Sequence, residues 1–214
     1  MIKKYFLLLL AAILLTGVHG QNRQVDLSQN IPLQDILKKA KKQKKHVLLD
    51  FGSPRCSPCL FIKNKIFTID SVADFINERF VSVDYTEGPE KKRLSKIYEV
   101  YTEPVLLICD ANGKVMHRME GKCTAGEMMA RLRQGLDVKN NLTAQKLMYD
   151  NGNRSSEFLI NYLETLHIAG LRTQRDSVLH NIFSLSFHVD SLKTPKYWNV
   201  FLRYNESPVS QEGS

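Results

Sequence analysis

The chain of 214 residues has few of the patterns that mark metalloproteins and cysteine hydrolases. Its four cysteines do not form two C-x-x-C pairs, so their spacing fits no zinc site of that kind. Its six histidines are scattered, and no motif pairs one of them with a cysteine, which argues against a cysteine hydrolase. We therefore expect neither a metal ion nor another cofactor.

The chain also lacks an apolar run long enough to span a bilayer. The run from Phe6 to Leu15 is about ten residues long, whereas a transmembrane helix needs about 20. A basic start at residues 1–5 and a small-residue exit at 18–20 complete the pattern of a secretory signal peptide, and no lipoprotein cysteine follows. We expect residues 1–20 to be a bacterial-type signal peptide and the protein to be periplasmic or secreted; an uncleaved anchor is the alternative.

The charge pattern gives little support for a nucleic-acid-binding protein. The formal net charge of +8 falls by two when Lys3 and Lys4 leave with the leader. Much of the remaining excess lies in the lysine-rich residues 38–45. Such a run is typical of a solvated helix face, although a phospholipid or nucleic-acid patch would have the same composition. We expect no nucleic-acid partner.

Two of the four cysteines stand where thiol chemistry is expected. Cys56 and Cys59 enclose Ser57 and Pro58, follow a predicted buried strand at residues 46–51 and open a helix-compatible segment. The unsatisfied N–H groups at a helix N-terminus stabilise a thiolate more than a thiol. The sequence therefore predicts that Cys56 is the nucleophile of a redox pair.

This region resembles the thioredoxin superfamily over roughly residues 24–137, within the size of one domain. Four landmarks occur in the order of that family. They are residues 47–59 with the C-x-P-C motif, residues 98–108 with Pro104, the turn at 110–114, and Gly121. The resemblance implies an α/β fold with a mixed sheet flanked by helices, and the helical and strand periodicities agree with it.

The resemblance assigns catalytic roles to three residues. Cys56 would attack a substrate disulfide, and Cys59 would resolve the mixed disulfide. Asp50 would lie roughly two-thirds buried beneath the pair, with a raised pKa, and would take the proton of Cys59. A strand-end Asp50 in water is the alternative.

The resemblance also implies a substrate-binding surface. Pro104 would be cis and would leave the backbone of Thr102 and Glu103 free to pair with an extended substrate, unless it is an ordinary trans proline. Arg55 and Glu103 depart from the family, which often has Trp before the first cysteine and an apolar residue or Thr before the proline. The predicted substrate-binding residues are Arg55, Pro58, Thr102, Glu103 and Pro104.

The elements outside the motif follow from periodicity and end signals. We expect a thioredoxin-like domain at 21–138, a helical extension at 139–204 and a polar tail at 205–214. The extension either packs on the domain or offers a platform for a protein partner. Predicted helices involve residues 33–40, 71–76, 94–98, 124–136, 143–149, 158–166, 178–183 and 195–202, and predicted strands 46–51, 80–84, 105–109 and 114–119.

The other two cysteines give weaker predictions. Cys109 ends an apolar strand and should be a buried small hydrophobe, whereas Cys123 lies in a loop and could be exposed. The sequence does not decide whether these two are bridged, because a disulfide needs Cα atoms within about 7 Å.

Together these patterns predict a thiol-disulfide oxidoreductase that acts on protein disulfides in the cell envelope and is recharged by a separate redox donor or acceptor protein. The alternative is an adaptor that binds a partner and uses the pair Cys56 and Cys59 as a structural staple. Reductase, oxidase and isomerase activity all fit the sequence, as do many substrates.

Overall fold

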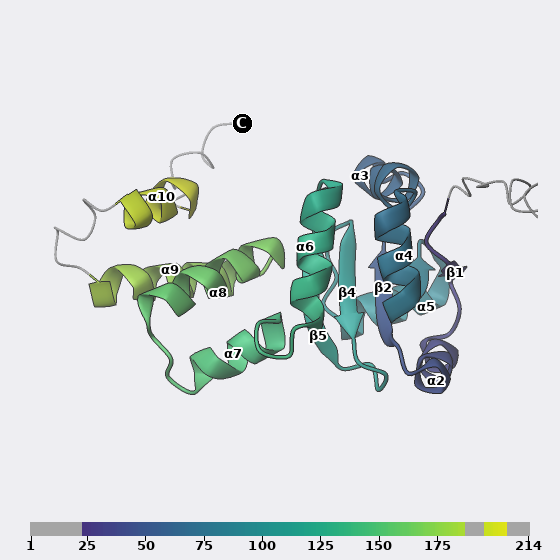
Figure 1. The fold of residues 1–214 in the computed structure, drawn as a ribbon, viewed down its shortest axis with the longest axis horizontal. Helices are drawn as coiled ribbons and strands as arrows, with labels where there is room; N and C mark the ends of the chain where they lie inside the picture. Colours follow the sequence, from purple (N-terminus) through teal and green to yellow (C-terminus); the bar gives the residue numbers. More distant parts are fainter. Residues whose placement is uncertain (1–22, 187–194, 205–214) are drawn as a thin grey trace, which may run out of the picture.

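The computed structural model describes residues 23–186 and 195–204 and contains a five-stranded sheet of order β1-β3-β2-β4-β5 (Figure 1). β3 is parallel to both β1 and β2, whereas β4 is antiparallel to β2 and to β5. The sheet is therefore mixed, as the sequence predicts. The strands are β1 (Leu27–Gln29), β2 (His46–Phe51), β3 (Phe80–Tyr85), β4 (Val105–Cys109) and β5 (Val115–Glu120).

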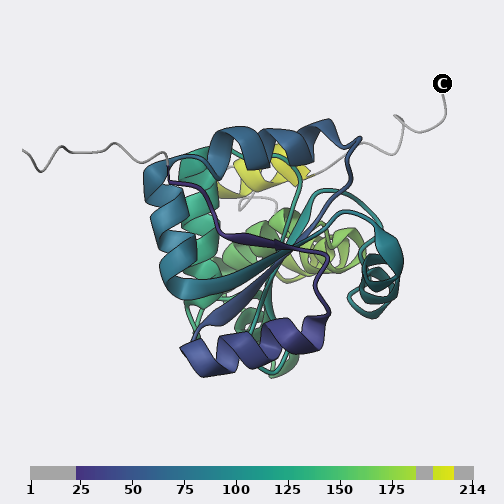
Figure 2. The same ribbon diagram turned by 90° about the vertical axis from the view of Figure 1, so that its right-hand side faces the viewer.

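Helices cover both faces of the sheet, and a view turned by 90° shows the twisted strands between them (Figure 2). One face packs against α2 (Leu33–Gln43) and α5 (Gly88–Ile97). The opposite face packs against helices that follow the cysteine motif or the last strand. These are α3 (Ser57–Phe61), the π-helical turn η1 (Ile62–Ile66), α4 (Asp70–Arg79) and α6 (Ala125–Leu136).

Side chains of β2 point alternately to the two faces of the sheet. Successive side chains of a strand point to opposite sides, so Val47 and Leu49 face α2 whereas Leu48 and Asp50 face the α3 side. The parallel register sets Asp50 of β2 opposite Asp84 of β3. Two carboxylates therefore share one face of the sheet, at the end where β2 leads to the cysteines.

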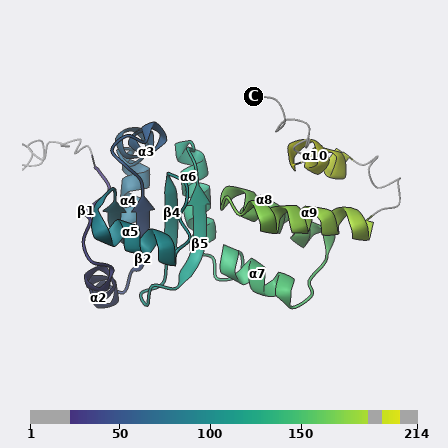
Figure 3. The ribbon, with the colours of Figure 1, turned by 180° about the vertical axis from the view of Figure 1, so that it is seen from behind.

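Four further helices follow the sheet, and we call them the helical extension. They share an apolar cluster of their own and lie together on the β5 side of the sheet (Figures 1 and 3). Thr143 Oγ1 donates to Val115 O at 2.9 Å and Leu142 N donates to His117 Nδ1 at 3.2 Å, so α7 covers the edge strand β5. The four are α7 (Leu142–Asp150), α8 (Ser156–Ile168), α9 (Arg172–Ser186) and α10 (Pro195–Tyr204).

Most predicted elements are present. The strand at 46–51 has the predicted bounds, and Thr124 and Glu127 form the predicted capping box at the start of α6. The hairpin turn at 110–114 closes with Asp110 N donating to Lys114 O at 2.9 Å. The lysine-rich residues 38–44 are exposed apart from Ala40, as a solvated helix face requires.

Two elements were not predicted, and some predictions lie outside the described residues. The sequence analysis missed β1, which has three residues and no apolar run, and the π-helical form of η1. The signal peptide at 1–20 and the tail at 205–214 lie outside the described residues. Within the described residues, no helix is long and apolar enough to cross a membrane.

Candidate functional site

The two cysteines of the motif lie at the start of α3, directly after β2. Cys56 is the N-cap of α3, and its Sγ accepts a hydrogen bond of 3.2 Å from the backbone N–H of Cys59. A disulfide of 2.02 Å joins the two residues, whose Cα atoms are 5.2 Å apart. Cys56 is partly exposed whereas Cys59 is 1% exposed. A substrate can therefore approach Cys56, and Cys59 is reached only through it.

The loop before β4 brings a carboxylate to the cysteines. The peptide bond between Glu103 and Pro104 is cis, as the resemblance implies. The ligating atoms of Glu103, Cys56 and Cys59 all lie within 4.8 Å of one another. With both cysteines reduced, this set is the one among the described residues with the spacing of a metal site, but sulfurs joined in a disulfide are not thiolate ligands.

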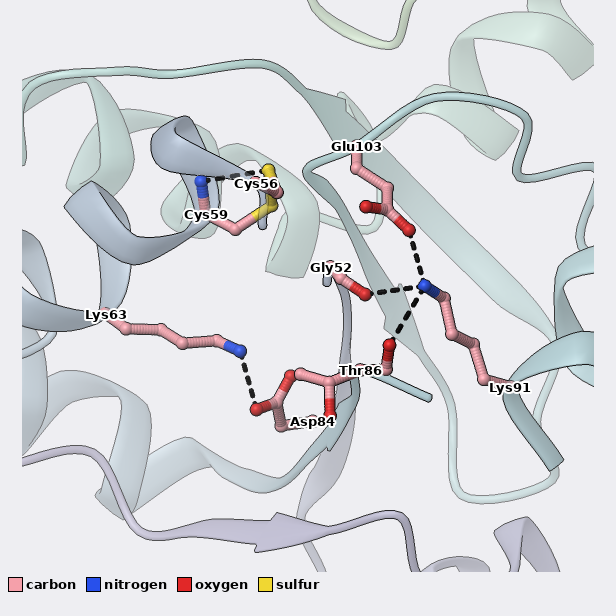
Figure 4. Close-up of a disulfide and its surroundings, with 8 residues drawn as sticks. All are labelled: Gly52, Cys56, Cys59, Lys63, Asp84, Thr86, Lys91 and Glu103. Carbon is pink, nitrogen blue, oxygen red and sulfur yellow. Dashed lines mark hydrogen bonds and ion pairs between the residues drawn. A yellow bond between two sulfur atoms is a disulfide. The ribbon is translucent and has the colours of Figure 1, made fainter. Parts of the chain in front are cut away.

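Lys91 of α5 neutralises the carboxylate beside the sulfurs. Its Nζ lies 2.5 Å from Glu103 Oε1 and donates to Gly52 O at 2.7 Å and to Thr86 O at 3.1 Å (Figure 4). Partial burial opposes ionisation of Glu103, but hydrogen bonds from Lys91 and Ser53 outweigh it and lower the pKa of this carboxyl. Glu103 is thus an ionised, paired group at neutral pH.

Asp50 is buried beneath the cysteines, with 1% of its surface exposed. Burial is the main cause that raises its pKa to about 7, the nearby charge of Asp84 raises it further, and the cation of Lys63 opposes them. Its Oδ2 has no hydrogen-bond partner among the described residues. The strand-end carboxylate in water, left open by the sequence, is excluded, and Asp50 is more buried than predicted.

Lys63 and Asp84 form an ion pair below the cysteines. Lys63 Nζ lies 2.6 Å from Asp84 Oδ2, and their side chains are 17% and 3% exposed (Figure 4). A Cβ built on Gly52 would lie 3.1 Å from Cys59 Sγ and 4.0 Å from Lys63 Nζ. Gly52 directly follows β2, and the charge of Lys63 acts on Asp50, so Cys59, Lys63 and Asp50 belong to one cluster.

The remaining predicted site residues surround this cluster at the surface. Arg55, Pro58 and Thr102 are exposed, and Arg55 makes no ion pair within the part of the chain that the structure describes. Sequence reasoning missed Lys63, Lys91 and Asp84. The position of Lys63, one helical turn after Cys59, was the signal that could have placed it below the pair.

The other two cysteines are separated from the motif and from each other. Both are free and buried, Cys109 on the α2 face of the sheet and Cys123 on the α3 face. Burial raises the pKa of Cys109 to about 12 and also raises that of Cys123. The expectation that Cys123 could be exposed is wrong, because its loop packs into the apolar cluster under α3 and α6.

Comparisons with known proteins agree with this geometry. Residues 33–136 match the family described as the thioredoxin-like domain. A candidate disulphide-isomerase from Bacteroides thetaiotaomicron has 27% sequence identity and a TM-score of 0.50, over 55% of this chain and 98% of that one. A thioredoxin from Thermus thermophilus has 22% identity and a TM-score of 0.48, over 56% and 93% of the two chains. A comparison with curated protein sequences finds no match.

Proposed function

Residues 33–136 form a thioredoxin-like domain, and from this premise we propose that the protein is a thiol-disulfide oxidoreductase that acts on protein disulfides in the cell envelope. The observation that carries the proposal is the pair Cys56 and Cys59 at a helix start, above a buried carboxylate whose pKa lies near neutrality. The signal-peptide pattern at residues 1–20 supports the location.

The first step is attack by the Cys56 thiolate on a substrate disulfide. A bond forms between Cys56 Sγ and one substrate sulfur while the substrate S–S bond breaks, and the second substrate sulfur leaves as a thiolate that takes a proton from water. The N–H of Cys59, donating to Cys56 Sγ, stabilises the negative charge on the attacking sulfur. Cys56 is the attacking sulfur because it is the exposed member of the pair.

The second step resolves the mixed disulfide. Cys59 transfers its proton to the carboxylate of Asp50, either directly or through water, and attacks Cys56 Sγ. The bond between Cys56 Sγ and the first substrate sulfur breaks, and that sulfur leaves as a thiolate, which takes a proton from water. Two electrons have then passed from the dithiol to the substrate, and the protein holds the disulfide seen in the structure. A pKa of about 7 lets Asp50 accept or return this proton near neutrality, so the same residues serve both directions.

The exposed segment before Pro104 is the proposed site of substrate pairing. The backbone of Thr102 and Glu103 makes no hydrogen bond within the described residues. Free N–H and C=O groups of an exposed backbone segment are available to pair with an extended substrate chain. Arg55 and Pro58 border the same surface, and a separate thiol or disulfide protein would recharge the pair.

Dithiothreitol-driven reduction of insulin tests the proposal directly. We expect the native chain to turn over, Cys56→Ser to be inactive, and Cys59→Ser to accumulate mixed disulfides with its substrates. In the reduced native protein, an alkylating reagent should modify Cys56 far faster than Cys59 at neutral pH. Cys109→Ser is the matched control, because this buried thiol lies on the opposite face of the sheet.

The adaptor alternative makes the opposite forecast for the same assay. A structural staple would not turn over with insulin. Mixed disulfides captured from cells by Cys59→Ser would identify substrates and the recharging partner. Absence of turnover in the native chain would favour the adaptor and would contradict the proposed function.

A further inference from the structure

We propose that the turn between α8 and α9 forms the outer wall of the substrate groove and favours substrate proteins that carry an acidic residue close to their disulfide. This inference rests on the proposed oxidoreductase function and gives the helical extension a part in choosing substrates. The occupant is an extended segment of the substrate, with its carboxylate opposite Arg172, the first residue of α9 directly after that turn.

The turn meets the sheet at the end that carries the cysteines. β4 and β5 are antiparallel, and their register places Val105 opposite Glu120. The backbone N–H of Gly121 donates to the carbonyl of Pro104 at 3.0 Å. Glu120 therefore lies beside the cis-proline loop, in which a carboxylate oxygen of Glu103 is within 4.8 Å of both sulfur atoms. A structure that packs on Glu120 also borders the substrate-binding surface.

Close contacts fix the α8–α9 turn against Glu120. Gly170 has a φ of +69°, and a Cβ built on it would overlap the Glu120 carboxylate, so the turn depends on glycine for both conformation and space. Arg118 is buried, donates from Nε to Ala169 O at 2.8 Å and pairs with Glu120 at 3.4 Å. Two residues of β5, Arg118 and Glu120, thus fix the position of Ala169 and Gly170.

A groove of about 430 Å³ lies between this turn and the loop before Pro104. Tyr101 and Thr102 line one side, and Arg172 and Gln174 line the other. Tyr101 is 82% exposed, and its backbone, like that of the next two residues, makes no hydrogen bond within the described residues. A substrate segment that adds to this backbone by strand pairing would therefore run between the loop and the turn.

The charged residues that line the groove determine whether an acidic or a basic substrate side chain binds there. Arg118 and Glu120 neutralise each other. Arg172 is exposed and has no ion-pair partner within the described part of the chain, whereas Glu99 is exposed and also lines the groove. A substrate carboxylate is attracted by Arg172 and repelled by Glu99, which fixes the part of the groove it occupies.

A peptide series tests this inference with dithiothreitol as the electron donor. Disulfide-linked peptides carry Glu, Gln or Lys at each position within about five residues of the cysteine. In an extended peptide each residue advances the chain by about 3.3 Å, so the series moves the charged side chain stepwise along the groove. At one or two positions we expect kcat/KM for Glu to exceed that for Gln by about two- to fivefold, the range of an exposed ion pair. Added salt should reduce the preference.

Substitutions of Arg172 assign the preference to the turn. Arg172→Gln should lower the Glu-to-Gln ratio to one or below, because the repulsion by Glu99 remains, and Arg172→Glu should favour the Lys peptide at the same position. Lys139→Gln is the matched control, because it removes one exposed positive charge just before α7, which contacts the other end of β5 at Val115. It should retain the native ratio.

Every other outcome contradicts either the groove inference or the oxidoreductase proposal. Equal kcat/KM for all peptides with the native protein would overturn the groove inference while the oxidoreductase proposal stands. A Glu preference that survives in both Arg172 variants would also overturn it. If no peptide is reduced at all, the oxidoreductase proposal fails, and the inference that rests on it fails as well.

Discussion

The face of the sheet under α2 and α5 is lined by apolar side chains from β2, β3 and β4, whereas the opposite face carries Asp50, Ser82 and Asp84 among its apolar residues. Within the described residues, each of these three has a buried side-chain oxygen without a hydrogen-bond partner. Such groups cost free energy in a folded protein. The α2 face therefore stabilises the fold, and the polar groups are concentrated on the face that carries the cysteines, where the proposed mechanism requires a proton acceptor.

The largest effect should come from breaking the ion pair of the polar face. Lys63→Met leaves Asp84 as an unpaired buried carboxylate, and loss of one partner in a buried pair costs about 3–5 kcal/mol. The free energy of unfolding from chemical denaturation at pH 7 measures the loss. The double variant Lys63→Met with Asp84→Asn should recover much of it; no recovery would show that Lys63 acts through packing alone.

Shortening a buried side chain on the α2 face should lower the stability of the protein without changing its redox chemistry. Leu49→Ala removes a fully buried side chain on the α2 side, and such changes cost about 2–5 kcal/mol. The pH profile of mixed-disulfide resolution should be unchanged, because Leu49 points away from Asp50. A displaced profile would mean that the two faces of β2 are not independent.

Asp50 should make the stability of the oxidised protein depend on pH. Its pKa is higher in the folded chain, so its contribution is complete below its ordinary value of 3.8 and is lost as the pH rises through about 7. Asp50→Asn cannot ionise and should be more stable than the native chain above pH 7, by about 2–4 kcal/mol. Denaturation of both oxidised proteins from pH 4 to 9 measures the difference.

The same substitution should also slow the second chemical step. Without the Asp50 carboxylate, Cys59 loses its proton acceptor, so resolution of a preformed mixed disulfide becomes slow near neutral pH while attack by Cys56 is nearly unaffected. Stopped-flow kinetics with a chromogenic mixed disulfide separates the two steps. A native pH profile in Asp50→Asn would exclude the proton-transfer role.

The smallest effect should come from the charges beside the sulfurs. Glu103→Gln removes a negative charge near Cys56 and should lower the pKa of its thiol, whereas Lys91→Gln and Arg55→Gln should raise it. Each shift should be about half a unit to one unit, roughly 1 kcal/mol, and should shrink in salt. Thiolate absorbance against pH measures it. Shifts of one sign for Glu103→Gln and Lys91→Gln would contradict this arrangement.

The sequence predicts the framework and the cysteine pair better than the charges around them. The continuous apolar run at residues 47–49 locates β2, and the position of Cys56 before a helix follows from the motif. The pairing of Lys63 with Asp84, and of Lys91 with Glu103, joins residues 21 and 12 positions apart through tertiary contacts that no local pattern encodes. The helical spacing from Cys59 could have placed Lys63 below the pair, but its partner Asp84, and the whole pairing of Lys91 with Glu103, follow only from the packing of the helices on the sheet.

The two edges of the sheet decide where a foreign strand can add. β1 is three residues long, and α7 closes the other edge through its contacts with β5 at Val115 and His117. Short and covered edges resist pairing with other chains. Both edges thus disfavour strand addition, and the proposed substrate pairing would take place instead at the short backbone segment of Thr102 and Glu103, beside Cys56.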